Sequence, residues 1–189
     1  MRMFVALYPS QEAAAHLETA LAEVRERLPT EDAQHIRWIP SERWHITLAF
    51  LAAVDPTRVD RLNRALADVA TEHAPLVDLG LTGSGVFGST VWIGVAPTER
   101  GSAAERLAKA TQRAARTCGI EVERRPWRAH LSIARTRGDR DQVRQVTREV
   151  TSSLSDYDGP LWSADTFTLV HSILGPQPQH IPVGSYALN

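Results

Sequence analysis

Four stretches of the chain place apolar residues three or four positions apart, which is the spacing of one face of a helix. Each stretch follows a residue that can cap a helix, namely Ser10, Asp55, Ser102 or Asp139. The spacing therefore predicts four amphipathic helices, each with one buried face. Their apolar stripes are Leu17, Leu21, Val24 and Leu28; Val59, Leu62, Leu66 and Val69; Leu107, Ala110 and Ala114; and Val143, Val146, Val150 and Leu154.

Shorter runs between these helices alternate apolar and polar residues, or are rich in β-branched and aromatic side chains, as strands are. The predicted strands are Met3–Leu7, Ile36–Ile39, His45–Leu51, Leu76–Leu81, Val91–Val95, Trp127–Arg135, Thr166–Ile173 and Ser185–Leu188. The half-polar alternation favours antiparallel sheets with one face open to solvent. Four helices and about eight strands predict an α+β fold, and Gly175–Gly184 is interpreted as a loop.

The composition narrows the class of protein. The chain has 189 residues, of which 43% are hydrophobic and 23% charged, which is typical of a globular protein and not of a disordered or fibrous one. The longest apolar run, Leu48 to Val54, is too short to span a bilayer. The single cysteine, Cys118, excludes an internal disulfide framework and a multi-cysteine zinc site. We therefore expect a cytoplasmic protein that does not bind membranes.

The charge of the chain is unevenly distributed. The formal net charge is −1, yet the segment from Arg124 to Arg148 has eight arginines and two acidic residues, a net charge of +6, and the rest of the chain carries −7. Charge runs on helices are usually solvated, but a basic segment of this kind can also contact an RNA backbone. The distribution favours local capture of one phosphate-bearing end over coating of a nucleic acid.

Two of the predicted strands share the pattern His-x-Thr/Ser-aliphatic-Ala. The first contains His45 and Thr47, and the second, 85 residues later, contains His130 and Ser132. Because side chains alternate along a strand, each histidine shares a face with its hydroxyl residue, about 7 Å away along the backbone. Strict alternation turns a second set towards the core: Trp44, Ile46, Leu48 and Phe50 in the first strand, and Trp127, Ala129, Leu131 and Ile133 in the second.

This pairing of residue types suits phosphoryl transfer without a metal. Opening a cyclic phosphate needs a base for water and an acid for the leaving oxygen, and histidine, with a pKa of about 6.5, can be either at neutral pH. The hydroxyls of Thr47 and Ser132 can donate hydrogen bonds to phosphate oxygens, where charge grows in the transition state. The sequence has no His-Glu-x-x-His or Cys-x-x-Cys pattern, so we expect no metal and no cofactor.

Other residues near these strands are candidates for substrate contact or for packing. Gly83–Gly88 matches the dinucleotide pattern G-x-G-x-x-G, but a strand follows it where that site needs a helix, so we interpret it as a hairpin turn. Phe87 on this turn is then free to stack on a terminal base. Trp44 and Trp127 fall on core-facing positions and are expected to pack. His171, in the strand at 166–173, is a further candidate for substrate contact.

Together these features resemble the two-histidine (2H) phosphoesterase superfamily, and within it the bacterial and archaeal RNA 2′,3′-cyclic phosphodiesterases, also called 2′-5′ RNA ligases. The resemblance spans nearly the whole chain. The matching segments are Arg2–Leu7 for the opening strand, Ile36–Pro40 with Trp44–Leu51 for the first motif, Gly85–Phe87 with Val91–Val95 for the middle hairpin, His130–Arg135 for the second motif, and Phe167–Ser172 with Tyr186 for the closing strands.

The resemblance implies one bilobal α+β domain over residues 1–189, with two pseudo-symmetric halves of antiparallel sheet, flanked by helices, facing each other across a central active-site cleft. It also implies hydrolysis of an RNA 2′,3′-cyclic phosphate to a 2′-phosphate. His45 matches the proton donor to the 3′ oxygen, and His130 matches the base that activates water. The hydroxyls of Thr47 and Ser132 match phosphate-binding groups, with Ser132 standing where the family usually has Thr.

Arg135 matches a basic, phosphate-binding residue at the end of the second motif, although strict alternation turns it to the face away from His130. The expected partners are RNA ends or small cyclic nucleotides as substrates, and the protein is expected to be a monomer. Two other functions stay open. One is 2′-5′ RNA ligation, which is the same reaction reversed with an RNA 5′-hydroxyl in place of water. The other is a non-catalytic module that binds RNA ends through the basic segment, against which the intact histidine pairs weigh.

Overall fold

The computed structural model describes residues 1–123, 125–176 and 178–189, so Arg124, in the basic segment, and Gln177, in the predicted loop, lie outside the described residues. The α-helices are α1 (Gln11–Arg27), α2 (Thr30–Ala33), α3 (Val59–Thr71), α4 (Ala103–Thr117) and α5 (Arg140–Ser153). The strands are β1 (Met3–Leu7), β2 (Ile36–Trp38), β3 (Ile46–Leu51), β4 (Leu76–Phe87), β5 (Thr90–Ala96), β6 (His130–Thr136), β7 (Trp162–Ala164), β8 (Thr166–Ile173) and β9 (Gln179–Ala187).

The four predicted helices form, and they begin close to the predicted caps. The side chains of Ser10, Ser102 and Asp139 each accept a backbone N–H from the first turn of α1, α4 and α5. Asp55 instead caps a 3-10 turn, Pro56–Arg58, that leads directly into α3. The apolar stripes are buried with few exceptions, so packing against the sheet stabilises the same faces that the spacing predicts.

The predictions of a turn over Gly83–Gly88 and of a loop over Gly175–Gly184 are wrong in part, because strand pairing extends further along the chain than the local sequence pattern indicates. β4 continues to Phe87, so only Gly88 of the glycine-rich segment lies in the hairpin turn, with a positive φ of 57°. Gly85 is needed inside this strand because the Trp92 ring of β5 occupies the space that a Cβ would fill. Likewise, β9 begins at Gln179, so the second half of Gly175–Gly184 pairs with β8.

The strands form one sheet in the order β7-β4-β5-β6-β3-β1-β8-β9, with β2 added beside β6, and all the pairings are antiparallel. Between β3 and β6 only one residue pair is in register, Ile46 with Leu131. The sheet is therefore divided at this point into two halves. We call β1, β3, β8 and β9, with α3 and α4, the His45 lobe, and the remaining strands, with α1, α2 and α5, the His130 lobe.

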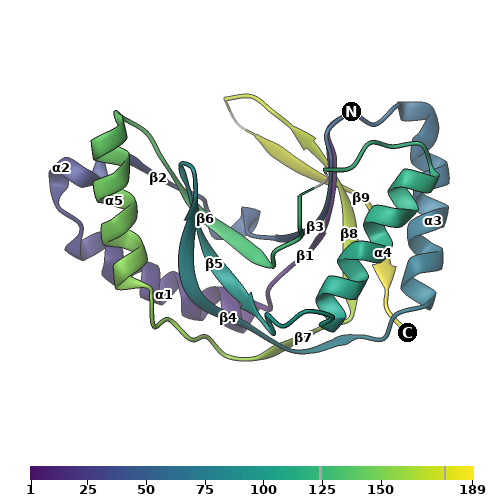
Figure 1. Cartoon of the computed structure of the whole chain (residues 1–189), viewed down its shortest axis with the longest axis horizontal. Helices are drawn as coiled ribbons and strands as arrows, with labels where there is room; N and C mark the ends of the chain where they lie inside the picture. The colour runs from purple at the N-terminus through teal and green to yellow at the C-terminus, as the bar shows by residue number, and fades with distance from the viewer. Residues whose placement is uncertain (124, 177) are drawn as a thin grey trace.

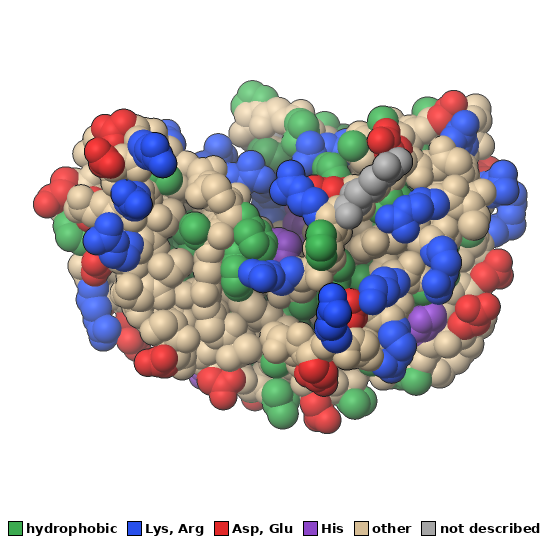
Figure 2. All heavy atoms as spheres, viewed as in Figure 1, with side chains coloured by type: hydrophobic (Ala, Val, Ile, Leu, Met, Phe, Trp, Pro, Cys, Tyr) green, Lys and Arg blue, Asp and Glu red, His purple; other side chains and the backbone are tan. Residues whose placement is uncertain are grey.

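The helices cover the outer sides of the two lobes and leave a hollow between them (Figure 1). In Figure 1, α1, α2 and α5 lie on one side of the molecule, and α3 and α4 lie on the other. The space-filling view shows the hollow from the same side, with histidine side chains inside it (Figure 2). We call this hollow the cleft. The predicted α+β class, the flanking helices and the bilobal arrangement are confirmed.

Candidate active site

The two histidine motifs meet where the lobes join. Their four polar side chains, which we call the quartet, are His45, Thr47, His130 and Ser132. The paired residues between them, Ile46 and Leu131, are 1% and 0% exposed and face the core, so the quartet faces the cleft. Continuing this antiparallel register by one residue sets each histidine across from the hydroxyl residue of the other motif. The fold thus brings the four predicted residues to one place.

A β-bulge follows the hydroxyl residue in each motif strand. The register of β3 against β1 shifts at Leu48, and the register of β6 against β5 shifts at Ile133. One extra residue in a strand reverses the facing of every side chain beyond it. Phe50 and Arg135 therefore lie on the cleft face with the quartet, and the alternation that turned both of them away from the cleft was wrong.

Both histidines are held by a hydrogen bond to the backbone two residues earlier. The Nδ1 atom of His45 is 2.7 Å from the carbonyl oxygen of Arg43, and that of His130 is 2.8 Å from the carbonyl oxygen of Arg128. A carbonyl oxygen can only accept, so each Nδ1 carries the proton and donates it. In the neutral ring this leaves Nε2 with a free lone pair, and in the charged ring Nε2 carries a second proton.

Two rings enclose His45 from its own lobe. Phe4 of β1 is stacked on it with centroids 4.5 Å apart, and His180 of β9 meets it edge to face at 5.2 Å. His180 also contacts Phe4, at 5.0 Å. No local pattern in the sequence points to His180, because only the long-range pairing of β1, β8 and β9 brings it here. His171 pairs with the fully buried Met3 and shares its side of the sheet, away from the cleft.

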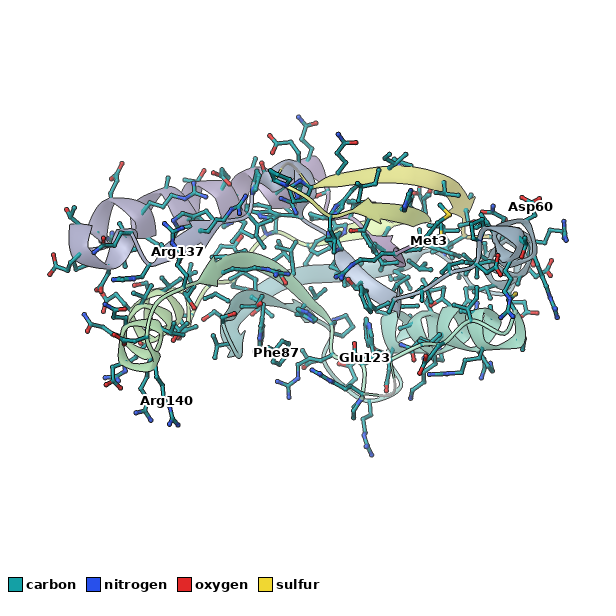
Figure 3. The ribbon with its side chains drawn as sticks, turned by 90° about the horizontal axis from the view of Figure 1, so that it is seen from above. Met3, Asp60, Phe87, Glu123, Arg137 and Arg140 are labelled. Carbon is teal, nitrogen blue, oxygen red and sulfur yellow. The ribbon has the colours of Figure 1, made fainter. Side chains whose placement is uncertain are left out.

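An aromatic cluster from β4 and β5 contacts His130. Phe87 lies edge to face on it at 5.1 Å, Trp92 lies at 6.2 Å, and the guanidinium of Arg128 is 5.8 Å and 5.9 Å from the centres of these two rings. Phe87 ends β4, not a loop as predicted, and is 42% exposed. Seen from above, it lies between α5 and α4 (Figure 3). It therefore presents an accessible ring beside the quartet.

The two predicted packing tryptophans support the first motif. Trp44 is 1% exposed, and its indole N–H donates to the carbonyl oxygen of Ile39. The indole N–H of Trp127 donates to the carbonyl oxygen of Thr47 at 2.7 Å, which ties the segment before β6 to β3. Their role in packing is confirmed.

Basic groups dominate the electrostatics of the cleft around His45. Burial lowers the pKa of His45 to about 4, against a smaller rise from its bond to the Arg43 carbonyl, and the charges of His180, His130 and Arg43 lower it further. Burial also lowers the pKa of His180, and Arg43 and Arg2 add to this effect. The charged neighbours that lower the pKa of both rings are basic, so an anion that enters the cleft is attracted to the side where His45 and His180 lie.

The lowered pKa of His45 makes a stability prediction. Unfolding restores the pKa to about 6.5, so between pH 6.5 and 4 the unfolded chain binds a proton at His45 that the folded chain does not bind. Above pH 6.5 His45 is neutral in both the folded and the unfolded chain, so the free energy of unfolding is unaffected. As the pH falls towards 4, the unfolded chain is protonated first, and the free energy of unfolding falls by about 3 kcal/mol for a shift of this size. Urea unfolding of wild type and H45N at pH 7, 6, 5 and 4.5 should show a steeper loss for wild type. Parallel pH dependences would contradict the lowered pKa.

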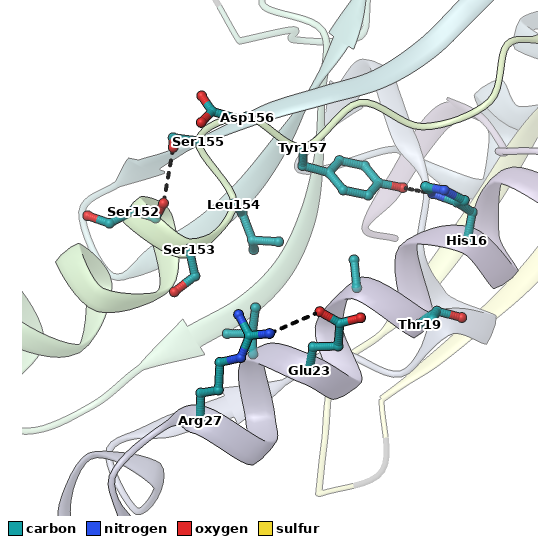
Figure 4. A pocket seen from close by; sticks show the side chains of 12 residues that line it. His16, Thr19, Glu23, Arg27, Ser152, Ser153, Leu154, Ser155, Asp156 and Tyr157 are labelled. Atoms are coloured by element: carbon teal, nitrogen blue, oxygen red, sulfur yellow. Dashed lines mark hydrogen bonds and ion pairs between the residues drawn. The ribbon is translucent and has the colours of Figure 1, made fainter.

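Other features of the described residues lie apart from the quartet. A pocket of about 430 Å³ opens between α1 and the segment after α5, where His16 Nδ1 and the Tyr157 hydroxyl are 3.0 Å apart (Figure 4). Among residues 1–123, 125–176 and 178–189, no three His, Cys, Asp or Glu side chains cluster as metal ligands. None of the helices in those ranges is both long and apolar enough to cross a membrane.

Comparison with known proteins supports the resemblance seen in the motifs. Over 182 residues the chain is 27% identical to the RNA 2′,3′-cyclic phosphodiesterase of Archaeoglobus fulgidus, covering 94% of both chains. It is 37% identical over 103 residues to the protein of the same name from Geobacillus stearothermophilus, and 33% over 101 residues to that of Bacillus subtilis. These two alignments cover 52% of this chain, but only 32% and 55% of those relatives.

Solved structures share the fold at lower sequence identity. A Thermus thermophilus protein superposes with a TM-score of 0.76 and 21% identity, covering 100% of this chain and 98% of that one. E. coli LigT in complex with 3′-AMP superposes with a TM-score of 0.72 and 19% identity, covering 99% and 96%. The sequence profile of the 2′-5′ RNA ligase superfamily matches residues 9–175, which include both histidine motifs. The chain therefore belongs to the 2′-5′ RNA ligase superfamily.

Proposed function

We propose that this protein hydrolyses the 2′,3′-cyclic phosphate of RNA ends or small nucleotides to a 2′-phosphate, without a metal, by histidine acid–base catalysis. One observation carries the proposal. Two histidines, each fixed through Nδ1 and each across from the hydroxyl residue of the other motif, face one cleft. Nε2 of each ring is left to exchange a proton with a bound group. The relatives named RNA 2′,3′-cyclic phosphodiesterase support the same reaction.

The reaction needs two proton transfers. Nε2 of neutral His130 takes a proton from water while the water oxygen bonds to phosphorus. The bond from phosphorus to the 3′ oxygen breaks, and Nε2 of charged His45 gives its proton to that oxygen. Atoms and charges balance, since one histidine gains the proton equivalent that the other loses. Each transfer contributes about 10²–10⁴-fold to the rate.

His45 must acquire its proton before it can act as an acid. With a pKa of about 4 it is neutral in the free protein at pH 7. A cyclic phosphate carries a negative charge, and an opposite charge within a few ångströms favours the charged form of a histidine. Substrate binding therefore raises the pKa of His45, and we expect proton uptake to accompany binding. The positive charges of Arg2 and Arg43, close to His45 and His180, attract the same negative phosphate.

Four further residues bind the phosphate or the base in this proposal. Thr47 and Ser132 donate hydroxyl hydrogen bonds to the non-bridging oxygens. Arg135 adds a positive charge from the cleft face that it reaches through the bulge in β6. Phe87, with Arg128 close to its ring, offers a stacking surface for the terminal base.

Turnover of 2′,3′-cyclic AMP in excess EDTA tests the proposed function. We expect full activity in EDTA and a single product, 2′-AMP, assigned by phosphorus NMR. Loss of activity in EDTA contradicts the metal-independent mechanism. Formation of 3′-AMP shows that the 2′ oxygen, and not the 3′ oxygen, is the leaving group. Joined product from RNA halves that bear a cyclic phosphate and a 5′-hydroxyl indicates ligation. RNA binding without turnover indicates a binding module.

A further inference from the structure

The outer face of α4 is basic throughout. Its exposed charged side chains are Arg106, Lys109, Arg113 and Arg116, and we call them the α4 stripe. The acidic residue of this helix, Glu105, has a side chain that is only 18% exposed, and it binds Lys109 at 2.7 Å. None of the ion pairs found in the described part of the chain involves the three arginines. The stripe thus keeps about three positive charges for a partner.

The α4 stripe has the geometry of a track. Its members follow one another by three, four and three positions, which places them along one side of a helix. Ten residues at about 1.5 Å each span about 15 Å. Successive phosphates of one stacked strand advance by about 3.4 Å along the helix axis, so the stripe is long enough to lie beside several of them.

The track is continuous with the cleft. On its inner side α4 packs on β3, and Gln112 donates to the carbonyl oxygen of Leu48, next to the first motif. The chain that follows α4 returns to β6 and carries the exposed Arg128 to the rim beside His130, whereas Arg125 before it is paired with Glu123 at 2.9 Å. In Figure 2, Lys and Arg side chains gather over α4 and continue to the hollow that holds the histidines.

The basic segment predicted from the sequence makes a poorer track. Its helix, α5, exposes Arg140, Arg144 and Arg148, but the exposed acids Asp141 and Glu149 lie among them. Opposite charges along one helix face leave little net field for a polyanion. Arg140 also points outwards from the side of the molecule, away from Phe87 (Figure 3). The exposed charges of α5 therefore favour contact with an RNA backbone less than those of α4, and the role predicted for the basic segment stays a prediction.

We infer that the α4 stripe binds the sugar-phosphate backbone of an RNA whose cyclic end occupies the cleft. The inference rests on the proposed function for the location of that end. It implies that the enzyme distinguishes an RNA from a free cyclic nucleotide. Both present the same reacting group to the quartet, but only the longer chain reaches α4.

The test is the triple variant R106Q/R113Q/R116Q, in which Gln preserves helix propensity and approximate length. Its matched control, R140Q/R144Q/R148Q, makes the same change on α5. For a 12-nucleotide RNA with a 2′,3′-cyclic end, log(kcat/KM) falls with log salt concentration. Loss of three phosphate contacts should reduce that slope by about 2 in the α4 variant. The α5 variant should keep the wild-type slope, and both should turn over 2′,3′-cyclic AMP within twofold of wild type.

Binding of the same RNA with a 2′-phosphate end, measured by fluorescence anisotropy, gives a readout that does not depend on catalysis. We expect the same change in salt slope for the α4 variant. An unchanged slope, or a larger change in the α5 variant, overturns the inference while leaving the proposed function intact. Failure to turn over 2′,3′-cyclic AMP in wild type contradicts the proposed function, and the binding data still decide whether α4 holds RNA.

Discussion

The variants H45N and H130N should each lose about 10²–10⁴-fold in kcat/KM on 2′,3′-cyclic AMP. Asn preserves an N–H at the δ position, so the hydrogen bond to the carbonyl of Arg43 or Arg128 can persist. What disappears is Nε2, the atom that exchanges protons in the proposed mechanism. The effect therefore reports the chemistry and not the packing of the strand.

The pH dependence separates the two roles. A base must be neutral and an acid must be charged, so wild type should show a bell-shaped profile of kcat. H130N should lose the limb that rises with pH, and H45N the limb that falls. The matched control is H171N, which changes a histidine on the other side of the sheet and should stay within twofold of wild type. A loss of less than threefold in H45N or H130N contradicts the proposed roles. If H45N instead loses the rising limb and H130N the falling limb, His45 is the base and His130 the acid.

Removing one hydroxyl of the quartet should have the next largest effect. T47V and S132A each delete a proposed donor to the phosphate oxygens, where charge accumulates in the transition state, and we expect a loss of about 10²-fold in kcat. Val has nearly the shape of Thr, so T47V changes little besides the hydrogen bond. Single-turnover measurements at saturating nucleotide give this loss directly.

The conservative variant S132T is the control for this prediction. It keeps the hydroxyl and restores the β-branch usual in the family, so its kcat should lie within a few-fold of wild type. T47S removes only the branch and should behave similarly. If S132A and S132T are equally impaired, the site requires a particular size at this position, and the proposed hydrogen bond is wrong.

Local sequence patterns were sufficient to predict the helices, their caps and the two motif strands, because these depend on spacing within a few residues. The quartet was also predictable, since equal motifs predict equal positions. The two bulges were not, although both motifs contain a sign of them. Leu48-Ala49 and Ile133-Ala134 are adjacent apolar pairs in strands that otherwise alternate, and all four residues are buried.

Features that depend on distant pairing could not be found from the sequence. His180 reaches His45 because β9 pairs with β8 and β8 pairs with β1, a register that no local signal specifies.

The exposed positive charge of α4 could not be found from the running sum of charge along the sequence. A running sum counts buried and paired charges equally with free ones, whereas a partner is attracted by those that remain exposed.

The strand order has a consequence for how the chain acquires its cleft during synthesis. The sheet of the His130 lobe uses strands made between residues 36 and 164, whereas β1 of the His45 lobe lies between β3 and β8. Until residues 166–173 leave the ribosome, one edge of β1 has no neighbour, and Phe4 lacks its contact with Val170. His130 can therefore be held in place before His45 is, and the two come to face each other only when the last strands join.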